Sequence, residues 1–435
     1  MPHTVVIADD VTGANDIGIM YAKAGWNTLI YRYGDGERKN YAPCDVLIVD
    51  TDSRFDTAET AYRKVFRSLK AIPARGVRQY IDKQCSVFRG NIGAEFDAML
   101  DALHEDFAVV VLGFPDNGRT TLHGRHYVYG TLLENSQFRH DPVHPMTRSD
   151  LTEILRGQTE RPVGAVYYEA YDRGEAEVRR RLEVLRKTGG YCVMDVRDNR
   201  DLEFLAGILK NEKILCGSSA LSEYLARIEP GPKGKSARER PESREEKTLC
   251  VAGSLTPQTV GQIAYIRSRK RPVFELDTRK LFDPRPRAEE FARLRGLLER
   301  AYRSGGFALI HSMNEPERVE QTKKMAEARG IGNTAVSEMV SGALSGIARS
   351  VIEEFGIRNI IVCGGDTSAA LCGRLGIEGM RVLEEIEPGL PTCQSVDEPY
   401  YKLVLKSGSF GKPEFLAEAV RKLNGRKCPG PAETA

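Results

Sequence analysis

The first chemically dense segment of the chain lies within its first sixteen residues. An apolar run from Thr4 to Ala8 leads directly into Asp9-Asp10-Val11-Thr12-Gly13-Ala14-Asn15-Asp16. Carboxylates, a hydroxyl and a glycine therefore stand where a first strand would give way to a first helix. In open α/β sheets this carboxyl edge is where ligands bind. A helix cap accounts for one or two of these residues, so the whole set indicates a site that holds sugar hydroxyls, a metal or a proton to be moved.

Other loops of the N-terminal half are rich in Asp, Ser, Thr and Arg. They are Asp50-Thr51-Asp52-Ser53-Arg54, the segment 83–91 with Lys83, Arg89 and Gly90, and the segment 113–121 with Arg119. Turn chemistry explains any single one of these loops about as well as function does. Arginine is suited to a bidentate grip on a carboxylate, and aspartate to sugar hydroxyls. Taken together, the loops suggest a small polyhydroxylated acid as ligand.

In the C-terminal half, glycine occurs with serine or threonine after several strand-like runs. These loops are Gly253-Ser254-Leu255-Thr256, Gly364-Gly365-Asp366-Thr367 and Ser407-Gly408-Ser409-Phe410-Gly411. Glycines also mark plain turns, but glycine lets backbone N–H groups approach an anion, and a helix N-terminus adds a positive dipole. The repeated pattern predicts a nucleotide-phosphate site. The chain lacks GxxxxGK[ST] and has no GxGxxG after its first strand, which excludes a P-loop and disfavours an NAD-type fold.

Elements that could position these loops follow one another regularly along the chain. Strand-like runs alternate with amphipathic helical patterns, which predicts an α/β protein of two domains, each with a mainly parallel sheet flanked by helices. A cleft between the domains is the expected active site. The expected strands span residues 5–8, 46–49, 77–81, 108–112, 164–168, 191–195, 214–216, 249–252, 273–276, 307–311, 359–363, 381–385 and 402–405, and the expected helices include 94–103, 175–186, 336–355 and 413–423.

The most polar internal stretch, residues 230–248, is rich in Pro, Gly and Ser and has almost nothing to bury. It is therefore the expected linker. We expect a substrate-binding domain over residues 1–229, a nucleotide-binding domain over 249–427 and a frayed tail over 428–435.

Composition excludes several classes of protein. Among 435 residues, 63 basic and 61 acidic side chains give a net charge of +2, so there is no electrostatic argument for a nucleic-acid partner. No apolar run approaches the roughly 18 residues of a membrane helix, and the N-terminus has no signal-peptide pattern. The nine cysteines form no CxxC pair, which fits a reducing cytoplasm. The histidine pairs His123/His126 and His140/His144 lack supporting ligands, so no transition-metal site is expected.

Taken in their order along the chain, these motifs resemble those of the four-carbon acid sugar kinases, and the resemblance covers nearly the whole chain. The resemblance rests on segments 8–16, 89–95, 118–121, 253–256, 364–367 and 407–411. That family usually carries Lys-x-Asp-Ser-Thr before its Arg-Gly, whereas this chain has Lys83-Gln84-Cys85-Ser86-Val87. The acid is replaced by Cys85 and the threonine by Val87. The departure leaves open whether the acceptor is a tetronate or another sugar acid.

The resemblance implies ATP-dependent phosphorylation of a terminal hydroxyl on a small sugar acid such as D-threonate, D-erythronate or a 3-oxo-tetronate. It implies ATP and Mg²⁺ as cofactors, with Mg²⁺ bridging phosphates and no protein ligands identified for it. Asp10 is the expected catalytic base, with Asp9 and Asp16 as rivals, and Asp366 is open as base or metal contact. Residues expected at the substrate are Asp9, Asp10, Arg54, Lys83, Arg89, Gly90 and Arg119, and those expected at ATP are Ser254, Thr256, Gly364, Gly365, Asp366, Thr367, Gly408 and Gly411.

Two alternatives come from other functional classes. A non-catalytic sensor would bind a sugar acid without releasing ADP, and the set of phosphate-type loops counts against it. A dehydrogenase would need a nicotinamide cofactor, for which the expected glycine fingerprint is absent. The sequence leaves a homodimer open.

Overall fold

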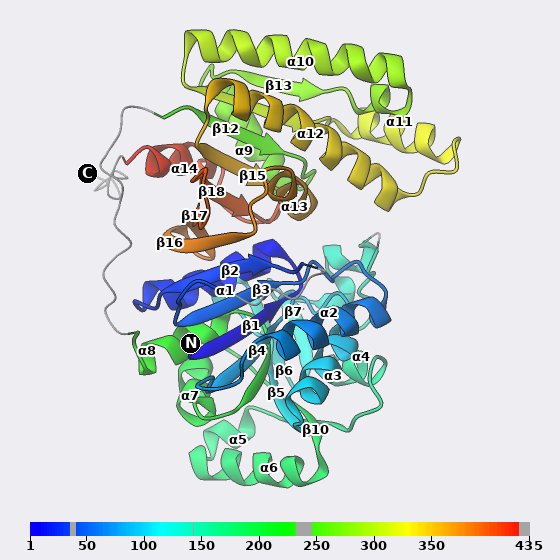
Figure 1. The fold of residues 1–435 in the computed structure, drawn as a ribbon. Helices are drawn as coiled ribbons and strands as arrows, with labels where there is room; N and C mark the ends of the chain where they lie inside the picture. The colour runs from blue at the N-terminus through cyan, green and yellow to red at the C-terminus, as the bar shows by residue number, and fades with distance from the viewer. Residues whose placement is uncertain (35–40, 142, 232–245, 426–435) are drawn as a thin grey trace, which may run out of the picture. The chain divides into compact units, whose positions relative to one another are not determined.

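The computed structural model describes residues 1–34, 41–141, 143–231 and 246–425. The chain divides into two compact units, Met1–Gly234 and Lys235–Ala435. Most of the stretch expected to be a linker, and all of the expected tail over 428–435, lie outside the described residues. Each unit is an α/β body with its own strands and covering helices (Figure 1).

The first unit contains a parallel sheet in the order β2-β3-β1-β4-β11-β5-β10-β9. Its central strands are almost continuous Val, Ile and Leu, because both faces of a parallel sheet are covered. The strands are β1 (Thr4–Ala8), β2 (Thr28–Arg32), β3 (Val46–Asp50), β4 (Gln79–Lys83), β5 (Phe107–Val111), β9 (Val163–Val166), β10 (Gly190–Met194) and β11 (Ile214–Gly217).

Helices cover both faces of this sheet. On one face α2 packs against α3, and on the other α8 packs against α1 and α7 (Figure 1). The helices are α1 (Val11–Lys23), α2 (Ala58–Ala71), α3 (Ile92–Leu103), α4 (Leu151–Arg156), α5 (Glu169–Asp172), α6 (Glu175–Thr188), α7 (Asn199–Leu209) and α8 (Ala220–Ile228). A small antiparallel sheet, with strands β6 (Arg119–Leu122), β7 (Arg125–Val128) and β8 (Thr131–Leu132), follows β5.

The second unit has the strand order β13-β14-β12-β15-β18-β17-β16. The strands from β13 to β18 in this order are parallel, and β17 and β16 continue the sheet antiparallel. A buried core forms where α9 and α14 cover the central strands. The elements are β12 (Thr248–Ala252), β13 (Val273–Leu276), β14 (Phe307–Ser312), β15 (Asn359–Cys363), β16 (Gly379–Glu387), β17 (Leu390–Ser395), β18 (Lys402–Lys406), α9 (Pro257–Ser268), α10 (Pro284–Ser304), α11 (Pro316–Glu327), α12 (Asn333–Phe355), α13 (Gly365–Arg374) and α14 (Phe415–Leu423).

The α/β class and the mainly parallel sheets are confirmed. The sequence analysis did not predict five of these strands, namely β2, β6, β7, β8 and β17. In each of them polar residues interrupt or flank the apolar ones, so that no long apolar run marks the strand. The strand expected over 164–168 ends earlier, at Val166, since Tyr168 already stands at the start of α5. No helix among the described residues is long and apolar enough to cross a membrane.

Candidate functional site

Three loops of the first unit begin side by side at the carboxyl edge of its sheet. Strand β1 lies between β3 and β4, with Ala8 opposite both Asp50 and Lys83. The residues that follow these strands therefore start at the same level. This register brings the acidic run after β1 next to the polar loops after β3 and β4.

Arg54 joins the first two acids of the opening motif. Its guanidinium makes a bidentate pair with Asp9, at 2.7 Å from Nε to Oδ2 and 2.8 Å from Nη2 to Oδ1. Its Nη1 also donates to Asp10 Oδ2 at 2.6 Å. Asp9 is fully buried, and both of its carboxylate oxygens accept hydrogen bonds from the arginine. Bidentate pairing fixes the arginine in one orientation.

Asp10 caps helix α1, and its carboxyl group is ionised. Its Oδ1 accepts the Gly13 N–H at 2.6 Å, which caps α1, and its Oδ2 accepts the Thr12 hydroxyl at 2.9 Å. Burial would raise the pKa of Asp10, but the charges of Arg54 and Lys83, together with these two hydrogen bonds, hold it below its ordinary value. The carboxylate is therefore ionised at neutral pH.

Asp16 lies one turn along α1 and is paired differently. Its Oδ2 accepts the Ser219 hydroxyl at 2.6 Å and lies 3.6 Å from Lys83 Nζ. Burial raises the pKa of Asp16 despite the nearby lysine. Gly13 closes the cluster, because a Cβ atom there would lie 2.8 Å from Asp10 Oδ1 and 3.2 Å from Lys83 Nζ.

The loop after β4 adds a second arginine and a thiol. Arg89 pairs with Asp141 through Nη1, and its Nη2 lies 3.5 Å from Cys85 Sγ. Burial would raise the pKa of the Cys85 thiol, but Arg89 and Arg54 hold it below its ordinary value. Gly90 has a φ of +113°, and a Cβ atom there would lie 3.4 Å from Arg54 Cγ. The two arginine loops are thus in close contact.

A buried acidic layer lies beside Asp9 and was not expected from the sequence. The Gln84 amide donates to Asp82 Oδ1 at 2.6 Å and to Glu95 Oε2 at 2.9 Å, and Ser53 donates to Glu95 Oε1 at 3.0 Å. Burial raises the pKa of Asp82 to about 8, and burial together with Asp82 raises that of Glu95 well above its usual range. Burial and mutual repulsion therefore disfavour a charge on both of these carboxyl groups at once. Asp82 gave little sequence signal, because its strand mixes polar and apolar residues, Gln-Tyr-Ile-Asp-Lys, and the strand expected over 77–81 ended before it.

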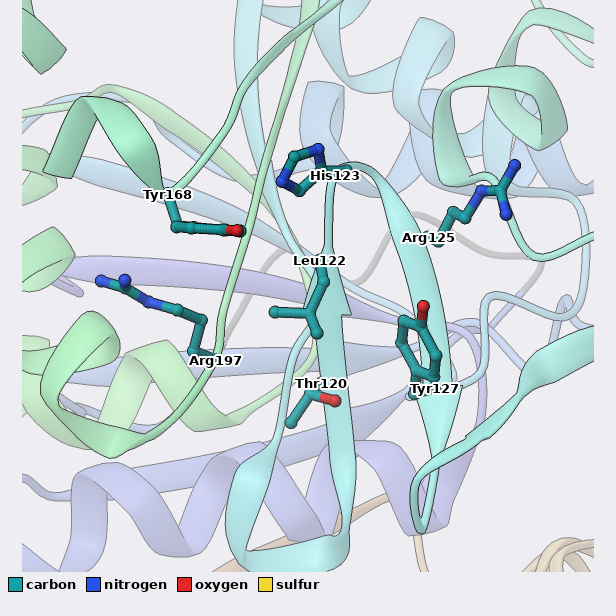
Figure 2. A pocket seen from close by; sticks show the side chains of 7 residues that line it. All are labelled: Thr120, Leu122, His123, Arg125, Tyr127, Tyr168 and Arg197. Carbon is teal, nitrogen blue, oxygen red and sulfur yellow. The ribbon is translucent and has the colours of Figure 1, made fainter. Parts of the chain in front are cut away.

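Arg119 makes its own contacts outside this cluster. Its guanidinium contacts the Asn117 carbonyl and stands 5.0 Å above the Tyr129 ring. The residues after it help to form a hollow of about 790 Å³, which contains none of the expected site residues (Figure 2). The hollow is lined by Thr120, Leu122, His123, Arg125, Tyr127, Tyr168 and Arg197.

In the second unit, three glycine-containing loops also start at one sheet edge. Strands β12, β15 and β18 are neighbours, and Cys363 is opposite both Ala252 and Lys406. The Gly364 N–H donates to the Lys406 carbonyl at 2.9 Å, which joins the second loop to the third. All the residues expected at ATP belong to these three loops.

Glycine is required where the loops touch. A Cβ atom at Gly253 would lie 2.0 Å from Thr367 Oγ1, and one at Gly408 would lie 2.0 Å from Ser254 Oγ. Gly364, with a φ of +117°, approaches the Ser254 N–H closely, so a Cβ atom there would lie 3.3 Å from it. These contacts explain the glycines as packing requirements, in addition to any ligand that they admit.

Helix α13 begins inside this group of loops. Gly365, Asp366 and Thr367 form its first turn, and their N–H groups have no acceptor among the described residues. Ser337 donates to Asp366 Oδ2 at 2.6 Å. Free N–H groups and the helix dipole at this end suit an anion such as phosphate.

Two side chains, those of Gln262 and Lys406, donate hydrogen bonds to carbonyls of the third loop, and neither was expected from the sequence. Gln262 Nε2 lies within 3.1 Å of the carbonyls of Phe410, Gly411 and Lys412. A Cβ atom at Gly411 would lie 2.9 Å from this nitrogen. Lys406 is buried beneath Ser407 and Gly408. A lysine at a strand end gives no sequence signal of burial.

The described residues contain no group of three or more His, Cys, Asp or Glu side chains that could hold a metal ion. Mg²⁺ bound with a nucleotide takes most of its ligands from phosphates and water and needs only one or two carboxylates. Asp366, a carboxylate at the start of α13, fits that limited role.

Substituting Gly253 tests the contact between the loops. Gly253→Ala should weaken nucleotide binding about tenfold, because its Cβ atom would displace Thr367 and the first turn of α13. Gly261→Ala is the matched control, since its Cβ atom meets nothing within 4 Å. Titration calorimetry with ATP measures both variants. Equal affinities for the two would contradict the packing argument.

Comparison with family models assigns each unit a binding role. A model described as a sugar-binding N-terminal domain matches residues 4–225, and one described as a nucleotide-binding C-terminal domain matches residues 249–416.

Similar proteins extend over almost the whole chain. A 3-oxo-tetronate kinase from Cupriavidus necator is 32% identical over 96% of this chain and 96% of its own length. One from Actinobacillus succinogenes is 31% identical over 95% and 98%. A solved structure from Salmonella typhimurium LT2 superposes with a TM-score of 0.81 at 28% identity, covering 96% of this chain and 99% of that one. Haemophilus influenzae protein HI1011 gives a TM-score of 0.72 at 28% identity, covering 95% and 98%.

Proposed function

Because the chain belongs to the four-carbon acid sugar kinase family, we propose that it transfers a phosphoryl group from ATP to a terminal hydroxyl of a small sugar acid. The observation that carries the proposal is the chemistry of the two sheet edges. One edge gathers acids and fixed cations in the sugar-binding domain, and the other gathers glycine loops around free N–H groups in the nucleotide-binding domain. The names of the relatives favour a tetronate-type acceptor.

We assign the binding of the acceptor's carboxylate to Arg89, with Lys83 contributing its positive charge, because the Lys83 side chain is 3% exposed and its Nζ already contacts Asp16 and the Gln84 carbonyl. Arg54 is less available, because Asp9 and Asp10 already occupy its donors. The Arg89 side chain is 20% exposed, compared with 11% for Arg54, and its Nη1 is held by Asp141. An arginine fixed in this way suits bidentate recognition of a carboxylate. The assignment of Arg119 to the substrate has the least support, since its contacts lie with Asn117 and Tyr129.

Asp10 is the proposed base for the acceptor hydroxyl. Its side chain is 14% exposed, compared with 0% for Asp9 and 7% for Asp16, so it is the most accessible of the three. The pKa of Asp10 is held below its ordinary value, whereas burial raises that of Asp16, so Asp10 is the more readily ionised of the two. Asp9 acts by orienting Arg54. In phosphoryl transfer such a carboxylate aligns the hydroxyl and accepts its proton.

The nucleotide side contributes mainly position and charge. The loops at Ser254, Gly364–Thr367 and Gly408 would hold the ATP phosphates, and bound Mg²⁺ would neutralise their charge. Ser254 and Thr256 act indirectly, because their hydroxyls are 3.1 Å apart and Thr256 donates to the Gly408 carbonyl at 2.6 Å. The chemistry requires the two bound ligands to meet in line with water excluded.

Cys85 bears on the choice of acid. Its thiol lies against Arg89 and within the field of Arg54. A carboxylate at this position would neutralise one of the two arginines more fully. The thiol therefore leaves a more positive substrate loop, which suits any sugar acid that carries its own negative charge and does not select a tetronate over another acid.

A coupled ADP-release screen across C4 to C6 aldonates and their keto forms tests this function. Tetronates or 3-oxo-tetronates should support ATP-dependent ADP release, and neutral polyols of the same length should not. Release with polyols but with no acid would overturn the carboxylate grip. Acid binding by calorimetry without ADP release from any substrate would favour the sensor alternative. No change at the nicotinamide absorbance band is expected on adding NAD or NADP.

A further inference from the structure

Lys406 is a fully buried lysine at the end of β18, and it has no carboxylate within ion-pair distance among the residues that the structure describes. Its Nζ donates to neutral oxygens only: the Ser407 carbonyl at 2.9 Å, the Thr259 hydroxyl at 3.2 Å and the Gly408 carbonyl at 3.3 Å. Burying an ammonium without a counter-charge is costly. Burial accordingly lowers the pKa of Lys406, so an ammonium here costs the fold stability and does not add to it.

These hydrogen bonds set the orientation of two successive peptide groups. In a trans peptide the C=O and N–H point in opposite directions. Since the carbonyls of Ser407 and Gly408 both turn toward the ammonium, the N–H groups of Gly408 and Ser409 turn away from it. Neither N–H has an acceptor among the described residues. Successive free N–H groups of this kind form an anion-binding concavity.

Other donors hold the same carbonyl in place. The Gly408 carbonyl also accepts the Thr256 hydroxyl at 2.6 Å and the Thr259 hydroxyl at 2.9 Å. Three donors thus converge on one oxygen. The loop is also joined to the start of α13 through the Gly364 N–H, which donates to the Lys406 carbonyl. Lys406 therefore lies at the junction of the phosphate-type loops.

We propose that Lys406 is the positioning residue of the nucleotide site: it draws two carbonyls inward so that the amides of Gly408 and Ser409 face the polyphosphate, and its buried charge is balanced when the polyphosphate binds. This inference rests on the proposed nucleotide-binding function. Lys406 does not itself touch the ligand, because its three N–H donors are already used by protein oxygens. Glu387, the carboxylate that acts on it through space, accepts the Lys412 N–H instead of pairing with it.

Dissociation constants for adenosine, ADP and ATP, with inorganic tripolyphosphate as a probe without a base, test the proposal. Lys406→Met should weaken binding of ATP and tripolyphosphate about tenfold to a hundredfold and leave that of adenosine unchanged. Lys402→Met is the matched control, because this lysine lies on the same strand away from the loops and pairs with Glu246. It should bind all four probes as the unsubstituted protein does.

The melting temperature without ligand gives a second readout. Lys406→Met should melt at the same temperature or higher, because it removes an unbalanced buried charge, and it should gain less on adding ATP. If Lys406→Met does not fold, Thr259→Val retains the lysine and removes its hydroxyl partner, and it should weaken ATP binding without affecting adenosine.

Equal losses for adenosine and ATP, or no loss of ATP affinity, would overturn the role of Lys406. If the unsubstituted protein binds no adenine nucleotide, the proposed function fails instead. The tripolyphosphate comparison between the unsubstituted protein and Lys406→Met then still decides whether Lys406 positions an anion site.

Discussion

Asp10→Asn should lower kcat by about 10²- to 10⁴-fold while leaving the binding of both ligands nearly unchanged. Asparagine is a good N-cap and can still accept the Gly13 N–H, so α1 keeps its start. What the variant loses is the ionised oxygen that would take the acceptor proton. Steady-state kinetics with the acid found in the ADP-release screen, together with calorimetry for each ligand, measure the split between kcat and KM.

Asp16→Asn is the matched control for this substitution. It lies on the same helix, and asparagine retains the contacts with Ser219 and Lys83 in neutral form. Because burial already raises the pKa of Asp16, removal of its charge should cost much less turnover than removal of the charge on Asp10. The reverse order of effects would transfer the role of base to Asp16, and near-normal turnover by Asp10→Asn would end its assignment.

Arg54→Met should destabilise the protein by about 3–5 kcal/mol near pH 7. Asp9 is fully buried and receives both of its arginine hydrogen bonds from this one side chain. Without Arg54 its charge has no partner at that contact. Urea unfolding measures the loss. Arg78→Met is the control, since its pair with Glu229 is exposed and should be worth less than about 1 kcal/mol.

The destabilisation should also depend on pH, with a sign that follows from Asp10. Arg54 is the main charge that lowers the pKa of Asp10 against the opposing effect of burial. In the unsubstituted protein this gives stability above the unfolded pKa of 3.8, which is lost as pH falls through the folded value. In Arg54→Met the pKa of Asp10 rises, so its folded state takes up a proton at higher pH. The difference in unfolding free energy should therefore shrink from pH 7 to pH 4.5, and a constant difference would contradict this pairing.

Much of the architecture follows from local patterns. Apolar runs such as Thr4–Ala8 and Asn359–Cys363 are buried on both sides in the structure, as expected for parallel strands. The loops after them were recognisable because acids, glycines and hydroxyls recur at several strand ends, which turn chemistry alone does not require. Periodicity failed where the signal was short. Thr28–Arg32 became a strand because β3 was available to pair with it.

The sequence by itself determined that acids, arginines and glycine loops stand at strand ends, because residue type and spacing are local properties. Only the tertiary structure decided which of these groups meet. Arg54 reaches Asp9 and Asp10 across more than forty residues because β1 and β3 are in register. Lys406 is buried because β18 ends beneath the loop at 407–411, whose carbonyls accept hydrogen bonds from its Nζ. Burial and partner charge set ionisation, and both depend on packing between segments that are distant in the sequence.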